Sequence, residues 1–116
     1  MKIRQAKLND ASGLGALSNQ LGYPAPSLQF VNRLRLLLNS KENMVFVCYI
    51  PENKLIGWIH VFIAYRLESD SFAEIGGFVV DEAYRGLGAG KKLLAEAEKW
   101  ALSDKPMQGI LPDHDY

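Results

Sequence analysis

Three of the ten glycines lie close together at Gly86, Gly88 and Gly90, where an apolar run gives way to a helix-like segment. Glycine lets the backbone approach a ligand closely, and the first amides of a helix have no acceptor within that helix. Those amides, the positive end of the helix dipole and the flanking cations Arg85 and Lys91 would together attract phosphate. A glycine-rich turn that serves packing alone would have the same sequence pattern, so this alternative stays open.

Two familiar phosphate-binding motifs do not fit this loop. A dinucleotide-binding motif, G-x-G-x-x-G, that began at Gly86 would need its third glycine where Lys91 stands. A P-loop, G-x-x-x-x-G-K-[ST], would need a glycine in place of Arg85 and a hydroxyl residue in place of Lys92. Nucleotide-binding domains of these two kinds are therefore disfavoured.

The loop needs a strand before it and a helix after it. Residues 72–81 predict that strand, and its apolar triplet at residues 78–80 indicates burial on both faces, as in a central strand. The helix after the loop continues to about Leu102. Its apolar residues recur on one stripe, at Leu93, Leu94, Ala97, Trp100 and Ala101.

The first third of the chain predicts one strand and two helices. Residues 2–8 alternate polar and apolar side chains, which indicates a strand. Asn9 or Asp10 can cap the first helix, and Gly22 can end it in the left-handed conformation. Ser27 can cap the second helix, whose apolar face comprises Phe30, Val31, Leu34, Leu37 and Leu38.

The middle of the chain predicts strands joined by short turns. Residues 44–50 and 55–66 are rich in strand-forming side chains. Polar turns are expected at residues 51–54 and 69–71, because Pro, Asn, Asp and Ser favour turn geometry. These strands and the one at 72–81 predict an antiparallel meander.

The segment from the strand to the helix resembles the Gcn5-related N-acetyltransferase (GNAT) family. Arg85, Gly88 and Gly90 satisfy the pattern [Q/R]-x-x-G-x-[G/A], which follows a Val-Val strand end and precedes a Lys-Lys-Leu-Leu helix. The order of elements from residue 1 is also similar. The resemblance implies an α+β fold with a mostly antiparallel central sheet and helices on both faces. It also implies one acyl-CoA N-acyltransferase-like domain over residues 1–116, incomplete at its C-terminus.

The resemblance further implies a site for acetyl-CoA as cosubstrate. The loop amides would hold the pyrophosphate, the strand backbone would pair with the pantetheine arm, and a main-chain amide would polarise the thioester carbonyl. Gly76 and Gly77 could mark the bulge that turns such an amide outwards, or could simply make room for a neighbouring side chain. The implied binding residues are Phe78, Val79, Val80, Arg85, Gly86, Leu87, Gly88, Ala89, Gly90 and Lys91.

Direct attack of an amine on a thioester requires a proton acceptor. Glu74 is the first candidate, because burial in an apolar strand would raise the pKa of its carboxyl, although an ion-paired Glu74 is the alternative. His60 is the second candidate, with a structural, hydrogen-bonded histidine as the alternative. Tyr23 resembles a position where relatives contact the acceptor, and a packing role is equally consistent with its type.

Composition narrows the partners. Thirteen basic and thirteen acidic residues cancel, which argues against nucleic acid or a membrane as the main partner. The single cysteine, Cys48, lies in an apolar run, can form no internal disulfide and has no metal-ligand spacing, so no metal is expected. With no signal peptide in the N-terminal residues, a cytoplasmic protein is the expectation.

These observations predict an N-acetyltransferase-like enzyme that transfers an acetyl group from acetyl-CoA to a primary amine of a small molecule or peptide. The alternative is a catalytically impaired acyl-CoA-binding or interaction module, because nothing after residue 111 matches the later helix and hairpin of relatives. A sheet that ended there would expose an unpaired edge. A homo-oligomer that covers this edge is therefore predicted.

Overall fold

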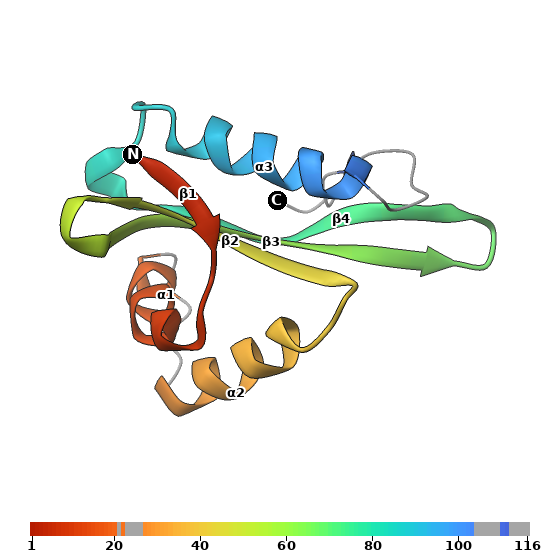
Figure 1. Ribbon diagram of the computed structural model, residues 1–116, viewed down its shortest axis with the longest axis horizontal. Helices are drawn as coiled ribbons and strands as arrows, with labels where there is room; N and C mark the ends of the chain where they lie inside the picture. Colours follow the sequence, from red (N-terminus) through yellow and green to blue (C-terminus); the bar gives the residue numbers. More distant parts are fainter. Residues whose placement is uncertain (21, 23–26, 104–109, 112–116) are drawn as a thin grey trace.

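A computed structural model describes residues 1–20, 22, 27–103 and 110–111. One sheet separates two helical layers, with helix α3 on one face and helices α1 and α2 on the other (Figure 1). The helices are α1 (Ala11–Asn19), α2 (Ser27–Leu38) and α3 (Ala89–Ser103), with short 3-10 turns at η1 (Leu8–Asp10), η2 (Pro51–Asn53) and η3 (Glu82–Tyr84). The strands are β1 (Lys2–Gln5), β2 (Asn43–Ile50), β3 (Lys54–Arg66), β4 (Ser69–Val80) and β5 (Ile110–Leu111). This arrangement confirms the predicted α+β class.

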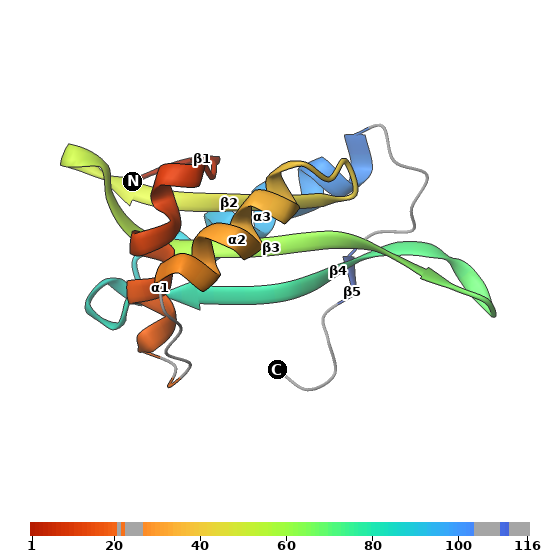
Figure 2. The same ribbon diagram turned by 90° about the horizontal axis from the view of Figure 1, so that it is seen from below.

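The strands follow chain order across the sheet, β1-β2-β3-β4-β5. The pairs from β1 to β4 are antiparallel, and β5 joins β4 in parallel (Figure 2). The predicted meander is therefore confirmed. Within the described residues, β5 pairs only with Ala73 and Glu74, so the part of β4 nearest the loop has a neighbour on one side alone. The predicted central position is confirmed, because β4 lies between β3 and β5 in the sheet. The apolar triplet at residues 78–80 is covered on both faces, since Phe78 and Val80 pack on the α3 side and Val79 is buried on the other.

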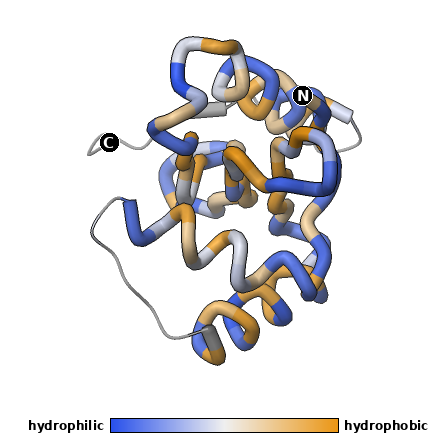
Figure 3. The backbone as a smooth tube through the Cα atoms, turned by 90° about the vertical axis from the view of Figure 1, so that its left-hand side faces the viewer, coloured by the Kyte–Doolittle hydropathy of each residue, from blue (hydrophilic) through white to orange (hydrophobic). Residues whose placement is uncertain are grey.

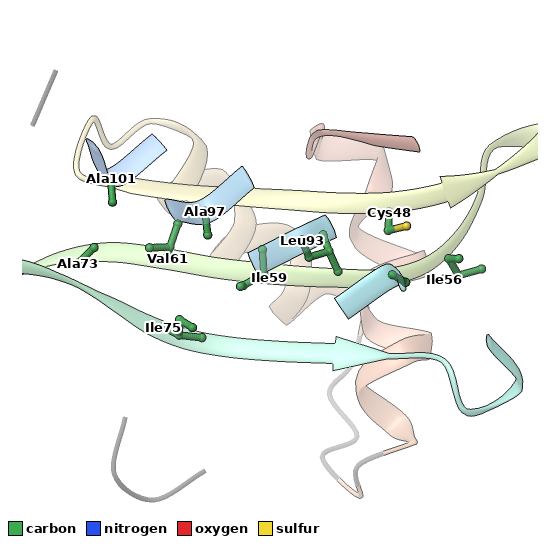
Figure 4. Close-up of a cluster of buried hydrophobic side chains, with 10 residues drawn as sticks. Cys48, Ile56, Ile59, Val61, Ala73, Ile75, Leu93, Ala97 and Ala101 are labelled. Atoms are coloured by element: carbon green, nitrogen blue, oxygen red, sulfur yellow. The ribbon is translucent and has the colours of Figure 1, made fainter. Parts of the chain in front are cut away.

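The core on the α3 face forms around the predicted stripe of that helix. Leu93, Ala97 and Ala101 are fully buried and lie beside Ile59 of β3 and Ile75 of β4 (Figure 4). The alanines let the helix approach the sheet closely, and the Leu93 side chain lies over Gly57 of β3. The apolar stripe thus places the start of α3 over the end of β4.

The core on the opposite face packs α1 and α2 against β2 and β3. Leu14 of α1, Leu34 of α2 and Val47 of β2 are buried together. Hydrophobic and hydrophilic residues alternate along the helical tubes, as amphipathic helices require (Figure 3). The predicted apolar face of α2 is confirmed, since Phe30, Val31, Leu37 and Leu38 pack against this cluster.

Two predicted boundaries are wrong for physical reasons. The first strand ends at Gln5 rather than residue 8, because the Asp10 carboxylate accepts hydrogen bonds from Arg4 (2.7 Å) and from the Lys7 amide (2.7 Å) and bends the chain into η1. The turn expected at residues 69–71 lies at 67–68, and Ser69 already pairs with Arg66. The polar residues at 69–71 belong to a solvent-exposed strand end rather than to a turn.

Candidate functional site

The loop between β4 and α3 is shaped by local hydrogen bonds and by glycine. The Asp81 carboxylate accepts from the Ala83 amide (2.9 Å), and the Tyr84 amide donates to the Asp81 carbonyl (2.9 Å), which forms η3. Gly86 and Gly88 then adopt φ of 82° and 95°. Side chains rarely tolerate these angles, so these glycines determine the path of the loop into α3.

The first amides of α3 come before the start of the helix's own hydrogen bonds. The helix's hydrogen-bond ladder begins with the Lys92 amide, which donates to the Gly88 carbonyl at 3.1 Å, so the amides of Ala89, Gly90 and Lys91 precede it. A pocket of about 610 Å³ opens at this point. It is lined by Phe78, Val80, Tyr84, Arg85, Gly86, Gly88, Ala89, Gly90 and Lys91. Amides, a helix N-terminus and two cations therefore meet in one pocket suited to a polyanion.

The structure brings together most of the residues that the sequence assigned to coenzyme binding. Two of them do not line the pocket, because Val79 is buried on the opposite side of β4 and the side chain of Leu87 is 60% exposed. Tyr84 does line it and was missed by sequence reasoning. Its hydroxyl accepts from Lys54 Nζ at 3.3 Å, and the ammonium also lies 5.2 Å from the ring centroid. An aromatic residue directly before Arg85 was the available signal.

Farther along β4, the paired glycines serve both of the roles that the sequence left open. His60 pairs with Gly77 and Val61 pairs with Ile75, which leaves Gly76 as the extra residue of a β-bulge. A Cβ on Gly76 would lie 2.7 Å from His60 Nδ1, and a Cβ on Gly77 would lie 2.6 Å from the Trp58 ring. The bulge and the space for two β3 side chains therefore occur together.

His60 has a defined orientation at this bulge. Its Nε2 lies 2.8 Å from Asn43 Oδ1, and the Asn43 amide nitrogen donates to Ser40 Oγ at 2.9 Å. A carbonyl oxygen only accepts, so Nε2 carries the hydrogen and Nδ1 keeps its lone pair. Burial lowers the pKa of His60, which favours the neutral ring. The ring centroid lies 5.5 Å from that of Phe62.

Glu74 has a partner. Its neighbours Ala73 and Ile75 belong to the core on the α3 face, so the Glu74 side chain lies on the α1 and α2 face, as His60 does. Its Oε1 accepts from Arg66 at 3.2 Å. This is the ion-paired arrangement that was the alternative to a desolvated carboxyl. Its role as a base stays a prediction, and Tyr23 lies outside the described residues.

A second, smaller pocket of about 140 Å³ adjoins His60 on the α2 side of the sheet. It is lined by Leu14, Phe30, Arg33, Leu34, Leu37, Val45, Trp58 and His60. The Trp58 Nε1 group is buried, and no described residue accepts its hydrogen. This pocket is mostly apolar. Near the bulge, Trp58 Nε1 and His60 Nδ1 are left to contact a ligand.

The described residues include neither a metal-binding cluster nor a membrane-spanning helix. They contain no group of three or more His, Cys, Asp or Glu residues placed to hold a metal ion. No helix among them has the length and apolar character that crossing a membrane requires.

Comparison with known proteins places these features in a family context. The sequence matches the acetyltransferase (GNAT) family over residues 17–109. No curated protein matches it. Many solved structures share its fold. A GNAT family acetyltransferase from Staphylococcus aureus is 24% identical with a TM-score of 0.84, and the match covers 99% of this chain and 87% of that one.

Two other similar structures have named activities or ligands. Glucosamine-6-phosphate N-acetyltransferase from Arabidopsis thaliana is 21% identical with a TM-score of 0.84, covering 97% of this chain and 80% of that one. AAC(6')-Iy, solved with the bisubstrate analogue CoA-S-monomethyl-acetylneamine, is 22% identical with a TM-score of 0.79, covering 97% and 78%. At these identities the similarity establishes the shared fold.

Proposed function

We propose that this chain, which belongs to the GNAT acetyltransferase family, binds acetyl-CoA at the start of α3 and transfers the acetyl group to a primary amine. The pocket at the glycine loop is the observation that carries the proposal. There, two glycines with positive φ precede the first amides of α3, and Arg85 and Lys91 line the same pocket. Acetyl-CoA supplies an activated acyl group as a thioester. The residues of the chain bind it, orient it and handle the proton.

The pocket suits the pyrophosphate of coenzyme A. Gly86 and Gly88 have nothing within 4 Å of an added Cβ, so the space above these residues is open to a ligand. The amides at the start of α3 provide hydrogen bonds and the helix dipole provides positive potential. Arg85 donates from Nε to the Val80 carbonyl at 3.4 Å, which holds its cation against the end of β4. These features support a diphosphate ligand over a neutral one.

The outer edge of β4 can take the pantetheine arm. From Val80 back to Gly76 the strand spans about 13 Å, at about 3.3 Å per residue. Along this stretch β4 is paired with β3 on one side, and the described part of β5 does not reach it. An extended ligand with amide groups could add to the sheet there as a strand does. An amide turned outwards by the bulge at Gly76 would then stabilise the developing oxyanion, worth about 3 kcal/mol.

Both base candidates lie on the face of β4 opposite α3. Glu74 is two residues from the bulge and is held by Arg66, whereas His60 Nδ1 lies directly over Gly76. Either group would accept the proton that the attacking amine loses. The products would be an N-acetylated amine and coenzyme A.

Titration calorimetry with acetyl-CoA tests the binding step. Acetyl-CoA should bind and should protect the fold against heat more than ATP or NAD does. Reversing the charge of the loop cation with Lys91→Glu should weaken binding by about tenfold or more. Lys99→Glu is the matched control, because Lys99 lies near the other end of α3. An absence of binding at saturating acetyl-CoA would refute the proposal.

Release of coenzyme A thiol in the presence of amines tests the transfer step. Turnover with at least one primary amine is expected. Acetyl-CoA binding without turnover across a broad amine panel would leave an acyl-CoA-binding module as the function. The ion pair between Glu74 and Arg66 is the observation that favours this second candidate, since it occupies one of the two predicted bases.

A further inference from the structure

The small pocket beside His60 carries an inference about the acceptor, which rests on the proposed acetyl transfer. His60 connects this pocket to the bulge, because it lines the pocket and its Nδ1 lies 2.7 Å from the position of a Cβ on Gly76. An amine that entered from the α2 side would therefore meet His60 on the face of β4 opposite α3. The thioester would approach the same bulge from the β4 edge.

The orientation of His60 is set by a chain of hydrogen bonds from β2. The Ser40 hydroxyl accepts from the Asn43 side-chain amide, and Asn43 Oδ1 accepts from His60 Nε2. The free lone pair on Nδ1 then faces Gly76. Asn43 is uncharged, so it orients the ring without raising its basicity as a carboxylate partner would. Asn43 is thus a positioning residue, and His60 is the group that meets the acceptor.

The charges around this pocket do not favour a cationic ligand. No carboxylate is among its described lining residues, and its one permanent charge is the cation of Arg33 on α2. The nearest strand carboxylate identified on this face, Glu74, is paired with Arg66. The rest of the described lining is aliphatic or aromatic, and none of the described residues accepts the Trp58 Nε1 hydrogen. A ligand with an apolar body and a hydrogen-bond acceptor fits this chemistry.

The basicity of the acceptor follows from the same features. An alkyl amine, with pKa about 10.4, is almost entirely charged at neutral pH, whereas an α-amine, with pKa about 7.7 to 8.0, is partly neutral. Burial lowers the pKa of His60, so its neutral ring is a poor proton acceptor for a charged alkyl amine but an adequate one for a partly neutral α-amine. We propose that this pocket receives an apolar, weakly basic amine and that His60 Nδ1, oriented by Asn43, accepts the proton of that amine.

The step balances as follows. The neutral amine nitrogen attacks the thioester carbonyl carbon, a carbon–nitrogen bond forms, and the proton on nitrogen passes to His60 Nδ1. The carbon–sulfur bond then breaks and coenzyme A leaves as a thiolate. His60 releases its proton to solvent and the thiolate takes one up, so no other reactant is consumed.

Matched amines test the acceptor class. Phenylalaninamide and 2-phenylethylamine share an apolar ring but differ in the basicity of the amine, and spermidine is polycationic. At pH 7 the kcat/KM for phenylalaninamide, calculated per total amine, should be about 100-fold or more above that for the other two amines. The reason is that a larger fraction of phenylalaninamide is uncharged at this pH. Equal or faster acetylation of spermidine or 2-phenylethylamine would overturn the inference and leave the proposed function standing. Absence of acetyl-CoA binding by calorimetry would instead refute both.

Substitutions of Asn43 test the role of His60 with a readout besides activity. Asn43→Asp should raise the pKa of His60, measured by NMR of the ring in the protein without coenzyme, by about 1 unit or more. In the pH profile of kcat/KM, the acidic limb should move to higher pH by the same amount, because His60 must be neutral to accept a proton. Asn43→Leu should lower kcat by about tenfold or more without that shift.

Asn32→Asp is the matched control, because Asn32 is an exposed residue on α2 that does not line the pocket. It should change neither the pKa of His60 nor the pH profile. An Asn43→Asp protein in which the ring titrates differently but the pH profile stays in place would overturn the role of His60. Arg33→Glu should raise the spermidine rate relative to the phenylalaninamide rate by about tenfold, and Arg35→Glu should not. Equal effects of these two substitutions would contradict binding in this pocket.

Discussion

Replacing Gly88 with alanine tests the loop conformation on which the proposed coenzyme site depends. Gly88 has φ of 95°, and an added Cβ would meet no atom within 4 Å, so the cost is conformational rather than steric. Placing an L-residue there costs about 1 to 2 kcal/mol. The reduced entropy of the unfolded chain offsets about 0.4 to 1 kcal/mol of this. Gly88→Ala should therefore destabilise the protein by roughly 0 to 1.6 kcal/mol, with about 0.8 kcal/mol at the middle of these ranges.

Gly90 provides the matched control two residues away. It lies inside α3 and, unlike Gly88, does not have a positive φ, and an added Cβ would make an ordinary 3.5 Å contact with Phe78 Cζ. Alanine at a helical position is favoured over glycine by about 0.5 to 1 kcal/mol. The two substitutions should thus change the free energy of unfolding in opposite directions and differ by about 1 to 2 kcal/mol.

Equilibrium urea unfolding of the two variants without ligand measures this difference. The midpoints should be about 0.5 to 1 M apart, given the slopes typical of small domains. Calorimetry with acetyl-CoA then reports on the site, and Gly88→Ala should weaken binding by about tenfold because a relaxed φ redirects the loop amides. Equal midpoints together with equal affinities would refute the argument that Gly88 holds the loop in a binding conformation.

Three further predictions concern the body of the protein. Gly77→Ala should destabilise it by about 1 to 3 kcal/mol in urea unfolding, since the new Cβ would lie 2.6 Å from the Trp58 ring; unchanged stability would show that the ring is free to move. Burial would by itself raise the pKa of Asp10, but hydrogen bonds from Arg4 and a backbone amide outweigh it and hold that pKa below its usual value. The stability contributed by Asp10 is therefore present above about pH 4 and lost as pH falls through the lower folded pKa. When the melting temperature is measured as a function of pH, its fall at acidic pH should be shallower for Asp10→Asn than for the unchanged protein. Burial raises the pKa of the Cys48 thiol, so its reaction with a thiol reagent should be about 100-fold or more slower in the native protein than in urea; a fast native reaction would contradict its burial.

Local patterns predicted the elements that form the pocket at the glycine loop. The stripe of apolar residues that places α3, the glycines with positive φ and the cations beside them are all close together in the sequence. The conformations of Gly86 and Gly88 follow from their own backbone freedom, and the start of α3 follows from its own periodicity. Such features depend on neighbours within a few residues, so a single sequence carries them.

The surroundings of His60 and Glu74, the proposed acceptor side, depend on contacts between distant segments. His60 and Asn43 are seventeen positions apart, and their hydrogen bond exists because β2 and β3 pair in one particular register. The ion pair that changes the chemistry of Glu74 depends in the same way on the pairing of β3 with β4. Residue types could nominate His60 and Glu74 as bases but could not assign them partners.

By itself, the sequence determined the order of helices and strands, the glycine loop and the family to which the chain belongs, because local propensity and periodicity encode them. Only the tertiary structure decided that Gly76 and Gly77 lie beneath His60 and Trp58, and that a pocket whose described lining residues include no carboxylate adjoins the bulge. A side chain's surroundings, and hence its charge state and partners, are set by which strands pair and in what register. That information arises only when the whole chain is packed.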